Sequence, residues 1–402
     1  MNKVKLQSVI KLIKGKKPKN LSSEYKQGLM PYVDIKSFET GVIDKYTDGE
    51  KCVECKDGDL LIVCDGSRSG LIGKAIEGFV GSTLALIELD GRIDKNYLYY
   101  FIQGKYQLLN KNVKGTGTPH LKQDLLKSFE IAIPSLEIQK QIVQQIEESL
   151  SQLDSAVETL KKTKQQLEVY RQAVLKEAFE GRLSKHKTFS VDLCWLPSEE
   201  TTSLPQIPSE WKYIKLSNLG LLSRGKSKHR PRNDKKLFEN GKYPFIQTGD
   251  VKAADKYIID YTSMYGDFGL QQSKLWCTGT LCITIAANIA ETAFLGMDAC
   301  FPDSIVGFVP KENILAEYIR YFIESQKLRL WAYAPATAQK NINLKTLENL
   351  IVPYCSLEEQ NEIIRIIEEK MTVCLDIEKT VNQSLQQAEA LRQSILKQAF
   401  EG

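Results

Sequence analysis

The stretch LRQSILKQAFEG, at residues 391–402, repeats an earlier stretch of the chain, YRQAVLKEAFEG, at residues 170–181. Eight of these twelve positions are identical, and the offset between the two stretches is 221 residues. The same offset aligns SLEIQKQIVQQIEE (135–148) with SLEEQNEIIRIIEE (356–369). Residues 135–181 therefore recur as residues 356–402, and an internal repeat of this kind decides how the rest of the chain is divided.

Each copy of this segment predicts one long helix. Apolar residues recur at alternating steps of four and three, which is the 3.5-residue spacing of a coiled-coil seam. No proline or glycine interrupts either copy before Gly181 and Gly402, and glycine commonly follows a helix because it adopts the left-handed conformation without strain. The predicted seam residues are Ile146, Leu150, Leu153, Val157, Leu160, Leu167 and Val174 in the first copy and Ile367, Met371, Val381, Leu385 and Ile395 in the second.

A helix of about 44 residues is roughly 65 Å long, and its single apolar stripe has to be covered by a partner. We therefore predict that the two copies pack on each other. The alternative is that each helix packs only on its own globular domain. The seam leaves the direction of packing open, because parallel helices would bring the two preceding domains to the same end and antiparallel helices would bring them to opposite ends.

The segments between the long helices are duplicated as well. YLYYFI (97–102) matches YIRYFI (318–323), and His120 aligns with Asn341. The loops differ most, as in GKKPKN (15–20) against GKSKHRPRN (225–233), and diverging loops on a shared scaffold usually carry the binding differences. The predicted boundaries are a first globular domain at 1–134, a helix at 135–181, a connector at 182–208, a second globular domain at 209–355 and a helix at 356–402.

Composition narrows the classes of function. The net charge of +4 permits an acidic partner without indicating one. The nine cysteines are odd in number and unevenly spaced, which indicates free thiols in a reducing cytoplasm. Cys52 and Cys55 form a lone C-x-x-C motif without the second pair that a structural zinc site needs, so we predict no metal site. No stretch reaches the roughly 18 apolar residues of a membrane span.

The sequence also contains no motif of a catalyst. It has neither the phosphate-binding pattern G-x-x-x-x-G-K-[ST] nor the Asn-Pro-Pro tetrapeptide of adenine methyltransferases. Its three histidines, His120, His186 and His229, do not have the spacing of a metal site or a catalytic triad. We therefore predict that this chain is not an enzyme.

Over essentially its full length, the chain resembles the specificity subunits of type I restriction-modification systems. The resemblance rests on the Ile-Pro-x2-Trp-Lys segment at 207–212, on Tyr-Pro-Phe-Ile at 243–246 followed by Thr-Gly-Asp at 248–250, and on Pro-x-Leu-Glu-x-Gln at 134–139. The two Leu-Lys-x-Ala-Phe-Glu-Gly helix ends are its most specific part. The first domain departs from the family because it lacks the Pro-Trp segment, and the second helix has its proline shifted to Pro353.

This resemblance implies an α+β chain in which two mixed α/β target-recognition domains are separated by two long helices packed as an antiparallel coiled coil. Each domain would read one half of a bipartite, asymmetric site in double-stranded DNA. The helices would set the spacing of the half-sites and bind two modification (methyltransferase) subunits, which are joined by restriction subunits. S-adenosylmethionine, ATP and Mg²⁺ would be bound by those partner subunits, with no cofactor on this chain.

Candidate DNA contacts lie in the loops that differ between the two domains. Basic and polar side chains contact phosphates, and Arg, Lys, Asn and Gln pair with guanine and adenine edges. The residues that we select are Lys16, Lys17, Lys19, Ser67, Arg68, Ser69, Lys114, Thr116 and His120 in the first domain and Arg224, Lys226, Lys228, His229, Arg230, Arg232, Gln247, Thr248, Asn288, Gln339, Lys340 and Asn341 in the second.

The strengths of these candidates differ. A single exposed lysine is more often merely solvated, whereas RGKSKHRPR (224–232) holds five cations in nine residues and favours backbone contact. Gln247 and Thr248 fit a strand end as well as they fit base reading. The aromatic residues of YLYYFI and YIRYFI recur at helical spacing, which indicates core packing rather than base stacking.

Two other functions remain open at this stage. A coiled-coil scaffold or adaptor with protein-binding heads would explain the helices, although it gives no reason for basic loops that differ between duplicated domains. The same DNA reader could also serve a system that only methylates.

Overall fold

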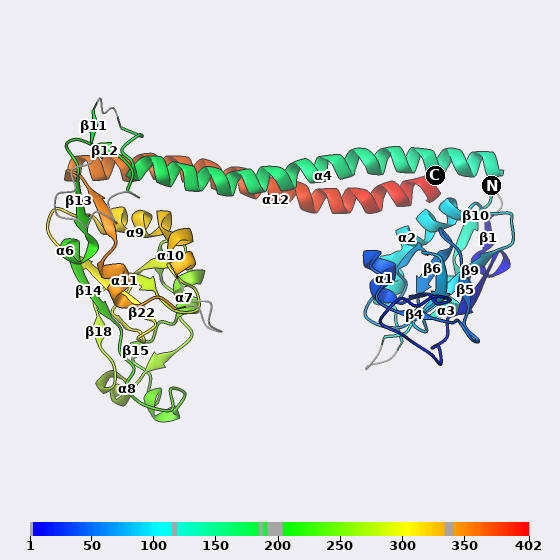
Figure 1. The fold of residues 1–402 in the computed structure, drawn as a ribbon, viewed down its shortest axis with the longest axis horizontal. Coiled ribbons are helices and arrows are strands. Elements are labelled where there is room, and N and C mark those ends of the chain that lie inside the picture. Colours follow the sequence, from blue (N-terminus) through cyan, green and yellow to red (C-terminus); the bar gives the residue numbers. More distant parts are fainter. Residues whose placement is uncertain (1–2, 115–118, 185–187, 191–203, 334–340, 402) are drawn as a thin grey trace. The chain divides into compact units, whose positions relative to one another are not determined.

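The computed structural model describes residues 3–114, 119–184, 188–190, 204–333 and 341–401. The chain divides into two compact units, with residues 1–162 and 381–402 in unit 1 and residues 163–380 in unit 2. Each unit therefore contains one globular part together with pieces of both long helices (Figure 1).

Unit 1 is built mainly from strands in its globular part. Its strands are β1 (Lys3–Lys5), β2 (Ile10–Lys14), β3 (Met30–Val33), β4 (Tyr46–Thr47), β5 (Glu54–Cys55), β6 (Leu60–Val63), β7 (Ile72–Lys74), β8 (Gly78–Val80), β9 (Leu84–Leu89) and β10 (Glu130–Ala132). Its shorter helices are η1 (Leu6–Ser8), α1 (Ile35–Thr40), α2 (Lys95–Lys111) and α3 (Gln123–Ser128). The strands form two four-stranded sheets, in the orders β2-β9-β6-β7 and β4-β3-β8-β5, and β1 pairs with β10.

Strand β6 lies at the centre of unit 1 because both of its faces are apolar. Leu60 and Ile62 pack in one core with Leu98 and Ile102 of α2. Leu61 and Val63, which point to the opposite face, pack in a second core on that side. Successive side chains of a strand alternate between the two faces of a sheet, so the uninterrupted apolar run LLIV produces a strand that is covered on both sides.

Unit 2 repeats this plan with more strands. They are β11 (Phe189–Ser190), β12 (Ile207–Pro208), β13 (Lys212–Lys215), β14 (Gly220–Arg224), β15 (Tyr243–Pro244), β16 (Tyr257–Ile258), β17 (Met264–Tyr265), β18 (Leu275–Trp276), β19 (Leu281–Thr284), β20 (Thr292–Leu295), β21 (Ala299–Cys300), β22 (Ile305–Pro310) and β23 (Ile351–Tyr354). The shorter helices are α6 (Leu216–Leu219), η2 (Lys235–Leu237), α7 (Thr248–Ala253), α8 (Asp267–Gln271), α9 (Ala316–Ser325), α10 (Lys327–Tyr333) and α11 (Leu344–Glu348). The main sheet has the order β14-β22-β19-β20-β16.

The duplication extends to the register of β2 on β9 and of β14 on β22. Lys14 of β2 lies opposite Ala85 of β9, and Arg224 of β14 lies opposite Val306 of β22. These two pairs are equivalent in the sequence repeat. Gly15 and Gly225, which follow the two strands, also occupy equivalent places, because a Cβ at either position would lie 2.2 Å from a backbone oxygen. The two domains therefore share the backbone frame of these strands, whereas the register of β20 on β19 differs by one residue from that of β7 on β6.

The repeated segments form the long helices α4 (Leu136–Phe179) and α12 (Leu357–Glu401). At their starts, the hydroxyls of Ser135 and Ser356 accept hydrogen bonds from the backbone N–H groups of Ile138 and Glu359, at 3.4 and 3.3 Å. Gly181 follows α4 in a left-handed conformation, with φ of 71°. The position of Gly181 matches the sequence-based prediction for the end of α4.

Within each unit, the pieces of α4 and α12 lie side by side and run antiparallel (Figure 1). In unit 1, Ile146 and Leu150 of α4 pack on Leu396 near the end of α12. In unit 2, the end of α4 shares a core with Ile363 and Ile367 near the start of α12. The structure thus confirms the antiparallel direction, which the seam had left open. Of the predicted seam residues, Ile146, Leu150, Leu153, Leu167, Val174, Ile367 and Val381 are buried and Val157, Leu160, Met371, Leu385 and Ile395 are half-buried.

The repeated helix ends pack on the globular parts. The ring centroid of Phe179, at the end of α4, lies 5.0 Å from that of Tyr318 and 5.4 Å from that of Phe322, both in α9 of unit 2. Phe400, at the end of α12, lies 5.0 and 5.3 Å from Tyr97 and Phe101, in α2 of unit 1. The helix that follows the first domain therefore ends on the second, and the helix that follows the second ends on the first. This double contact accounts for the repeated Phe of the Leu-Lys-x-Ala-Phe-Glu-Gly motif and confirms that these aromatic residues are core residues.

A buried glutamine attaches the start of each long helix to the domain before it. The Gln139 side chain is fully buried. Its Oε1 accepts from the N–H of Asp94 at 2.7 Å, and its Nε2 donates to the carbonyls of Arg92 and Pro134 at 3.0 and 2.9 Å. Gln360 makes the equivalent three bonds, with Leu315, Asn313 and Cys355. The Leu-Glu-x-Gln motif is therefore a structural attachment.

Strand β3 ends at Val33 and Ile35 begins α1, because the Asp34 carboxylate accepts a hydrogen bond from the N–H of Ser37. The eight described cysteines are all free, and burial raises the pKa of the Cys55 thiol to about 12. Among the helices of the described residues, none is long and apolar enough to cross a membrane.

Candidate nucleic-acid interface

In unit 1, three segments with candidate residues meet beside the end of β6. They are the loop after β2, the glycine-rich loop that begins at Asp65, and the segment that ends at His120. The N–H of Gly66 donates to the carbonyl of Pro119 at 2.8 Å, and the N–H of Leu121 donates to the carbonyl of Cys64 at 2.8 Å. The backbone therefore brings together residues that are more than fifty positions apart in the sequence.

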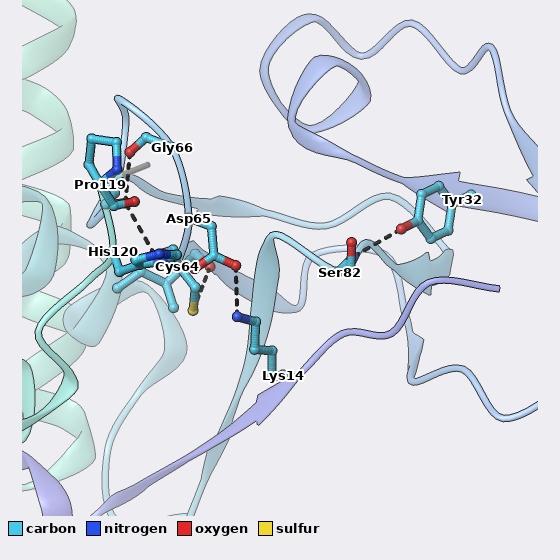
Figure 2. A network of polar contacts seen from close by, with 10 residues as sticks. Lys14, Tyr32, Cys64, Asp65, Gly66, Ser82, Pro119 and His120 are labelled. Carbon is cyan, nitrogen blue, oxygen red and sulfur yellow. Dashed lines mark hydrogen bonds and ion pairs between the residues drawn. The ribbon is translucent and has the colours of Figure 1, made fainter. Parts of the chain in front are cut away.

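A charged network lies at this meeting point. Figure 2 shows the Asp65 carboxylate between Lys14 and His120. The Lys14 Nζ donates to Asp65 Oδ2 at 2.7 Å, and His120 Nδ1 lies 2.7 Å from Asp65 Oδ1. Burial of Asp65 opposes its ionisation, but the hydrogen bonds from Lys14 and His120 outweigh that effect and lower the pKa of the carboxyl group. Asp65 is therefore an anion at neutral pH that holds a lysine and an imidazole in place.

The other candidates of unit 1 fall into three groups. Lys16, Lys17 and Lys114 are exposed and form no ion pair with any residue that the structure describes. Lys19 pairs with Glu50 at 3.1 Å and Arg68 pairs with Glu39 at 2.6 Å, so each shares its charge with a carboxylate. Ser67 is exposed, and Thr116 lies outside the described residues.

Ser69 is a correction to the sequence-based selection. Its side chain is fully buried. Its hydroxyl lies within hydrogen-bonding distance of the carbonyls of Gly66, Cys64 and Pro119, at 2.8, 3.2 and 3.2 Å. Ser69 therefore stabilises the glycine-rich loop from within, and its hydroxyl is not on the surface where a ligand could reach it.

In unit 2, the equivalent segments meet in the same way. Ala286 forms an isolated antiparallel bridge with Asn341, as Asp65 does with His120. The N–H of Ile342 donates to the carbonyl of Ile285 at 2.9 Å, which is the equivalent of the bond between Leu121 and Cys64. The same backbone frame therefore presents a different set of side chains at this place in the second domain.

The cationic loop after β14 is held by its own arginines. Arg224 Nε donates to the carbonyl of Asp303 at 2.7 Å, and Arg232 Nη2 lies 2.8 Å from the Asp303 carboxylate. Arg230 Nη1 donates to the carbonyls of Ser227 and His229 at 2.7 and 2.8 Å. These three arginines therefore help to shape the loop in addition to carrying charge.

The remaining polar groups of this loop differ in their availability. His229 Nε2 lies 2.7 Å from Asp234 Oδ2, and this hydrogen bond lowers the pKa of Asp234. Lys228 is exposed, Lys226 is half-buried, and neither forms an ion pair within the described part of the chain. Arg224 and Arg230 also lack a carboxylate partner, but backbone carbonyls hold their side chains. The two lysines are thus the uncompensated cations of the loop, in the sense that their side chains make neither an ion pair nor a backbone hydrogen bond with the described residues.

The other candidates of unit 2 lie on neighbouring turns. Gln247 is exposed before α7, and its Nε2 donates weakly to the hydroxyls of Thr262 and Ser263 at 3.4 and 3.3 Å. Thr248 and Asn288 are half-buried, and Asn341 is exposed. Gln339 and Lys340 lie outside the described residues.

Sequence reasoning missed the acidic partners of these cations. Asp65, Asp234 and Asp303 were not selected, although each holds candidate side chains in place. One signal for Asp65 was present, because the repeat aligns it with Ala286 at the start of a diverging loop. No group of three or more His, Cys, Asp or Glu that could hold a metal ion occurs among the described residues.

Comparison with known proteins supports the interpretation of the repeat. The family model for the type I restriction modification DNA specificity domain matches residues 1–169 and again residues 208–387. The MjaVIII specificity subunit of Methanocaldococcus jannaschii is 27% identical over 375 residues, covering 89% of this chain and 83% of that protein. The EcoBI specificity subunit of Escherichia coli is 26% identical over 412 residues, covering 100% of this chain and 85% of that protein.

Solved structures agree at the level of the fold. A chain from a type I restriction-modification system, solved to explain complex assembly and conformational transition, matches with a TM-score of 0.73 at 18% identity and covers 99% of this chain and 97% of its own length. The HsdS subunit from Thermoanaerobacter tengcongensis matches with a TM-score of 0.59 at 18% identity, over 100% and 96% of the two chains. With both globular parts matched by the family model, the chain belongs to the type I restriction-modification DNA specificity family and carries two copies of its domain.

Proposed function

We propose that this chain is the non-catalytic specificity subunit of a type I restriction-modification complex, in which each recognition domain reads one half of a bipartite, asymmetric DNA site. The recognition domains of this proposal are residues 1–134 and 209–355. The observation that supports this proposal is a contrast between the two domains: they share a strand framework but differ in the side chains of their loops. The equivalent strand pairs β2-β9 and β14-β22 keep the same register, whereas equivalent loop positions hold different polar residues. Two readers of different short sequences need this combination.

The adaptor function has less support. A protein-binding head gives no reason for uncompensated lysines on the same loops in which the two domains differ. Lysines that lack a carboxylate partner suit phosphates, since the phosphate backbone supplies most of the non-specific affinity for DNA.

The partners in this proposal supply the chemistry. Two modification subunits bind the long helices and carry S-adenosylmethionine, and restriction subunits carry ATP and Mg²⁺. The free cysteines suit the reducing cytoplasm in which such a complex would act.

The test is a selection of binders from randomised duplex DNA at a stated salt concentration, using the full chain assembled with its modification subunit. Two short, unlike motifs separated by a fixed gap are expected. Enrichment of no motif, while the modification subunit stays bound, would favour the adaptor function. A single motif would contradict the assignment of one reader to each domain.

Removing the two uncompensated lysines of the β14 loop is expected to weaken DNA binding without changing the preferred sequence. Log affinity falls as log salt rises, and each lost phosphate contact makes this negative slope less steep by about 0.9. Lys226→Ala with Lys228→Ala should therefore make it less steep by about 1.8. The measurement is a salt titration of DNA binding. Lys212→Ala with Lys345→Ala is the control, because these exposed lysines lie on β13 and α11 and not on the loop. An unchanged slope would place the loop outside the interface.

Lengthening both long helices by one heptad is expected to change the gap and leave the motifs unchanged. Seven residues inserted after Lys162 and seven after Thr380 preserve the 3.5-residue seam and lengthen each helix by about 10 Å. At roughly 3.4 Å per base-pair step, the gap should grow by about three base pairs. The gap is measured by the same selection from randomised duplex DNA. An insertion of four residues, which breaks the seam, serves as the control. An unchanged gap in the folded heptad variant would contradict a spacing role for the helices.

A further inference from the structure

The charged network of unit 1 has an equivalent set of residues in unit 2 with different chemistry. Lys14 and Arg224 end equivalent strands. Asp65 and Ala286 begin equivalent loops and bridge to His120 and Asn341, respectively. We call Lys14, Asp65 and His120 the first triad, and Arg224, Ala286 and Asn341 the second triad. The strand register before the first position and the bridges between the other two are equivalent, so the triads place different groups at the same place in the fold.

In the first triad, the contacts fix which nitrogen of His120 faces outward. The backbone N–H and carbonyl of His120 pair with Lys114 at 2.8 and 2.9 Å, so its Cα is held on both sides. Its Nδ1 is engaged by Asp65, while the side chain as a whole is 55% exposed. Nε2 makes no hydrogen bond with any residue that the structure describes. It is therefore the atom that His120 can offer to a ligand.

The ionised state of Asp65 decides the chemistry of that atom. A carboxylate only accepts hydrogen bonds, so His120 Nδ1 must carry the proton between them. In the neutral imidazole, Nε2 then has a free lone pair and acts as an acceptor. The exocyclic amino groups of cytosine and adenine are the donors that an acceptor meets in the major groove. Lys14 neutralises Asp65, so the carboxylate does not repel a nearby phosphate.

The second triad cannot hold a ring in this way, because Ala286 has no carboxylate. Arg224 instead donates from Nε to the backbone carbonyl of Asp303. Asn341 is exposed, and its amide offers a donor and an acceptor together, which is the pair that reads an adenine edge. At the same place in the frame, one domain thus presents an imidazole oriented by a carboxylate and the other presents an amide.

We infer that these two triads are specificity-determining positions, with His120 and Asn341 each contacting a base edge in its own half-site and Asp65 acting as the positioning residue for His120. This inference rests on the proposed function. It goes further by assigning part of the difference between the two half-sites to three exchangeable positions on a common backbone.

The test exchanges the triads in the full chain assembled with its modification subunit. One variant carries Lys14→Arg, Asp65→Ala and His120→Asn, and the reciprocal variant carries Arg224→Lys, Ala286→Asp and Asn341→His. Each is used to select binders from randomised duplex DNA alongside the unmodified chain. We expect the first variant to change one or two bases of one motif, and the reciprocal variant to change the other motif. The gap should stay the same in both.

A matched control removes another carboxylate from unit 1. Asp59 pairs with Lys95 at 3.0 Å and its side chain is 28% exposed, against 18% for Asp65. Asp59→Ala should leave both motifs unchanged. Asp65→Ala alone should broaden the preference at the position read by His120, because the ring loses its fixed orientation.

The outcomes separate the inference from the proposed function. If the unmodified chain enriches no motif, the proposed function fails. If the unmodified chain enriches two motifs but both triad variants keep them, the inference fails while the function stands. A variant that loses affinity equally for all sequences would also overturn the inference, since that result assigns the triad a purely structural role. If one variant does not fold, the reciprocal variant still shows whether a triad sets the sequence of its motif, because the two exchanges lie in different units.

Discussion

Replacing Gln360 by methionine is expected to destabilise unit 2 by about 3–5 kcal/mol. Methionine has a similar volume but cannot satisfy the N–H of Leu315 or the carbonyls of Asn313 and Cys355, which Gln360 now pairs. Each buried polar group left without a partner is destabilising by about 1–3 kcal/mol. The loss should appear in denaturant unfolding followed by tryptophan fluorescence, because all four tryptophans of the chain fall within residues 163–380.

The control for this substitution is Gln166→Met, on an exposed position of α4 in the same unit. Substitutions at such surface positions usually change stability by no more than about 0.5 kcal/mol. A loss of less than about 1 kcal/mol for Gln360→Met would show that water satisfies the three groups. Gln139→Met should have a similar effect on unit 1, where the same three bonds recur.

Exchanging residues 209–355 for the equivalent domain of another specificity subunit is expected to replace one half of the recognised DNA sequence and leave the other half intact. The frame of the domain is set by its own strands, and the loops that carry the difference all lie inside the exchanged segment. The donor domain has to keep aromatic residues at the positions of Tyr318 and Phe322, since the ring of Phe179 of α4 packs on both of them.

The measurement is again selection from randomised duplex DNA, with the unmodified chain in parallel. Exchange of residues 1–134 provides the matched comparison and should replace the other half only. If either exchange altered both motifs, the two domains would not be independent readers. If neither altered any motif, sequence recognition would lie outside both segments.

Much of the architecture was predictable because it is encoded in local spacing. The seam residues, the helix end at Gly181 and the duplicated frame all follow from patterns that repeat along the chain. The direction of helix packing did not follow from these patterns, since a 3.5-residue seam has the same period in parallel and antiparallel pairs. Leu175 and Leu396, which are more buried than their neighbours Val174 and Ile395, were also missed, because they face a globular domain and not the opposite helix alone.

The candidate interface was predictable only in part, for a different physical reason. Basic loops are visible in a sequence, but their carboxylate partners are not. Asp303 lies 71 positions from Arg232 and 79 from Arg224, so no local pattern connects them. Burial of Ser69 was equally hidden, because it depends on a carbonyl at Pro119, 50 residues away.

The contact of Phe400 with α2 has a consequence for the order in which the protein is completed during synthesis. Unit 2 is one continuous segment, whereas unit 1 needs residues from both sides of it. Domains usually fold as they leave the ribosome, the N-terminal one first. Here the later unit has all its residues available first, and the earlier one waits for Phe400 to cover Tyr97 and Phe101. A ribosome that stops shortly after residue 380 therefore releases a complete second unit attached to an unfinished first unit, whose uncovered aromatic surface is a target for chaperones and aggregation.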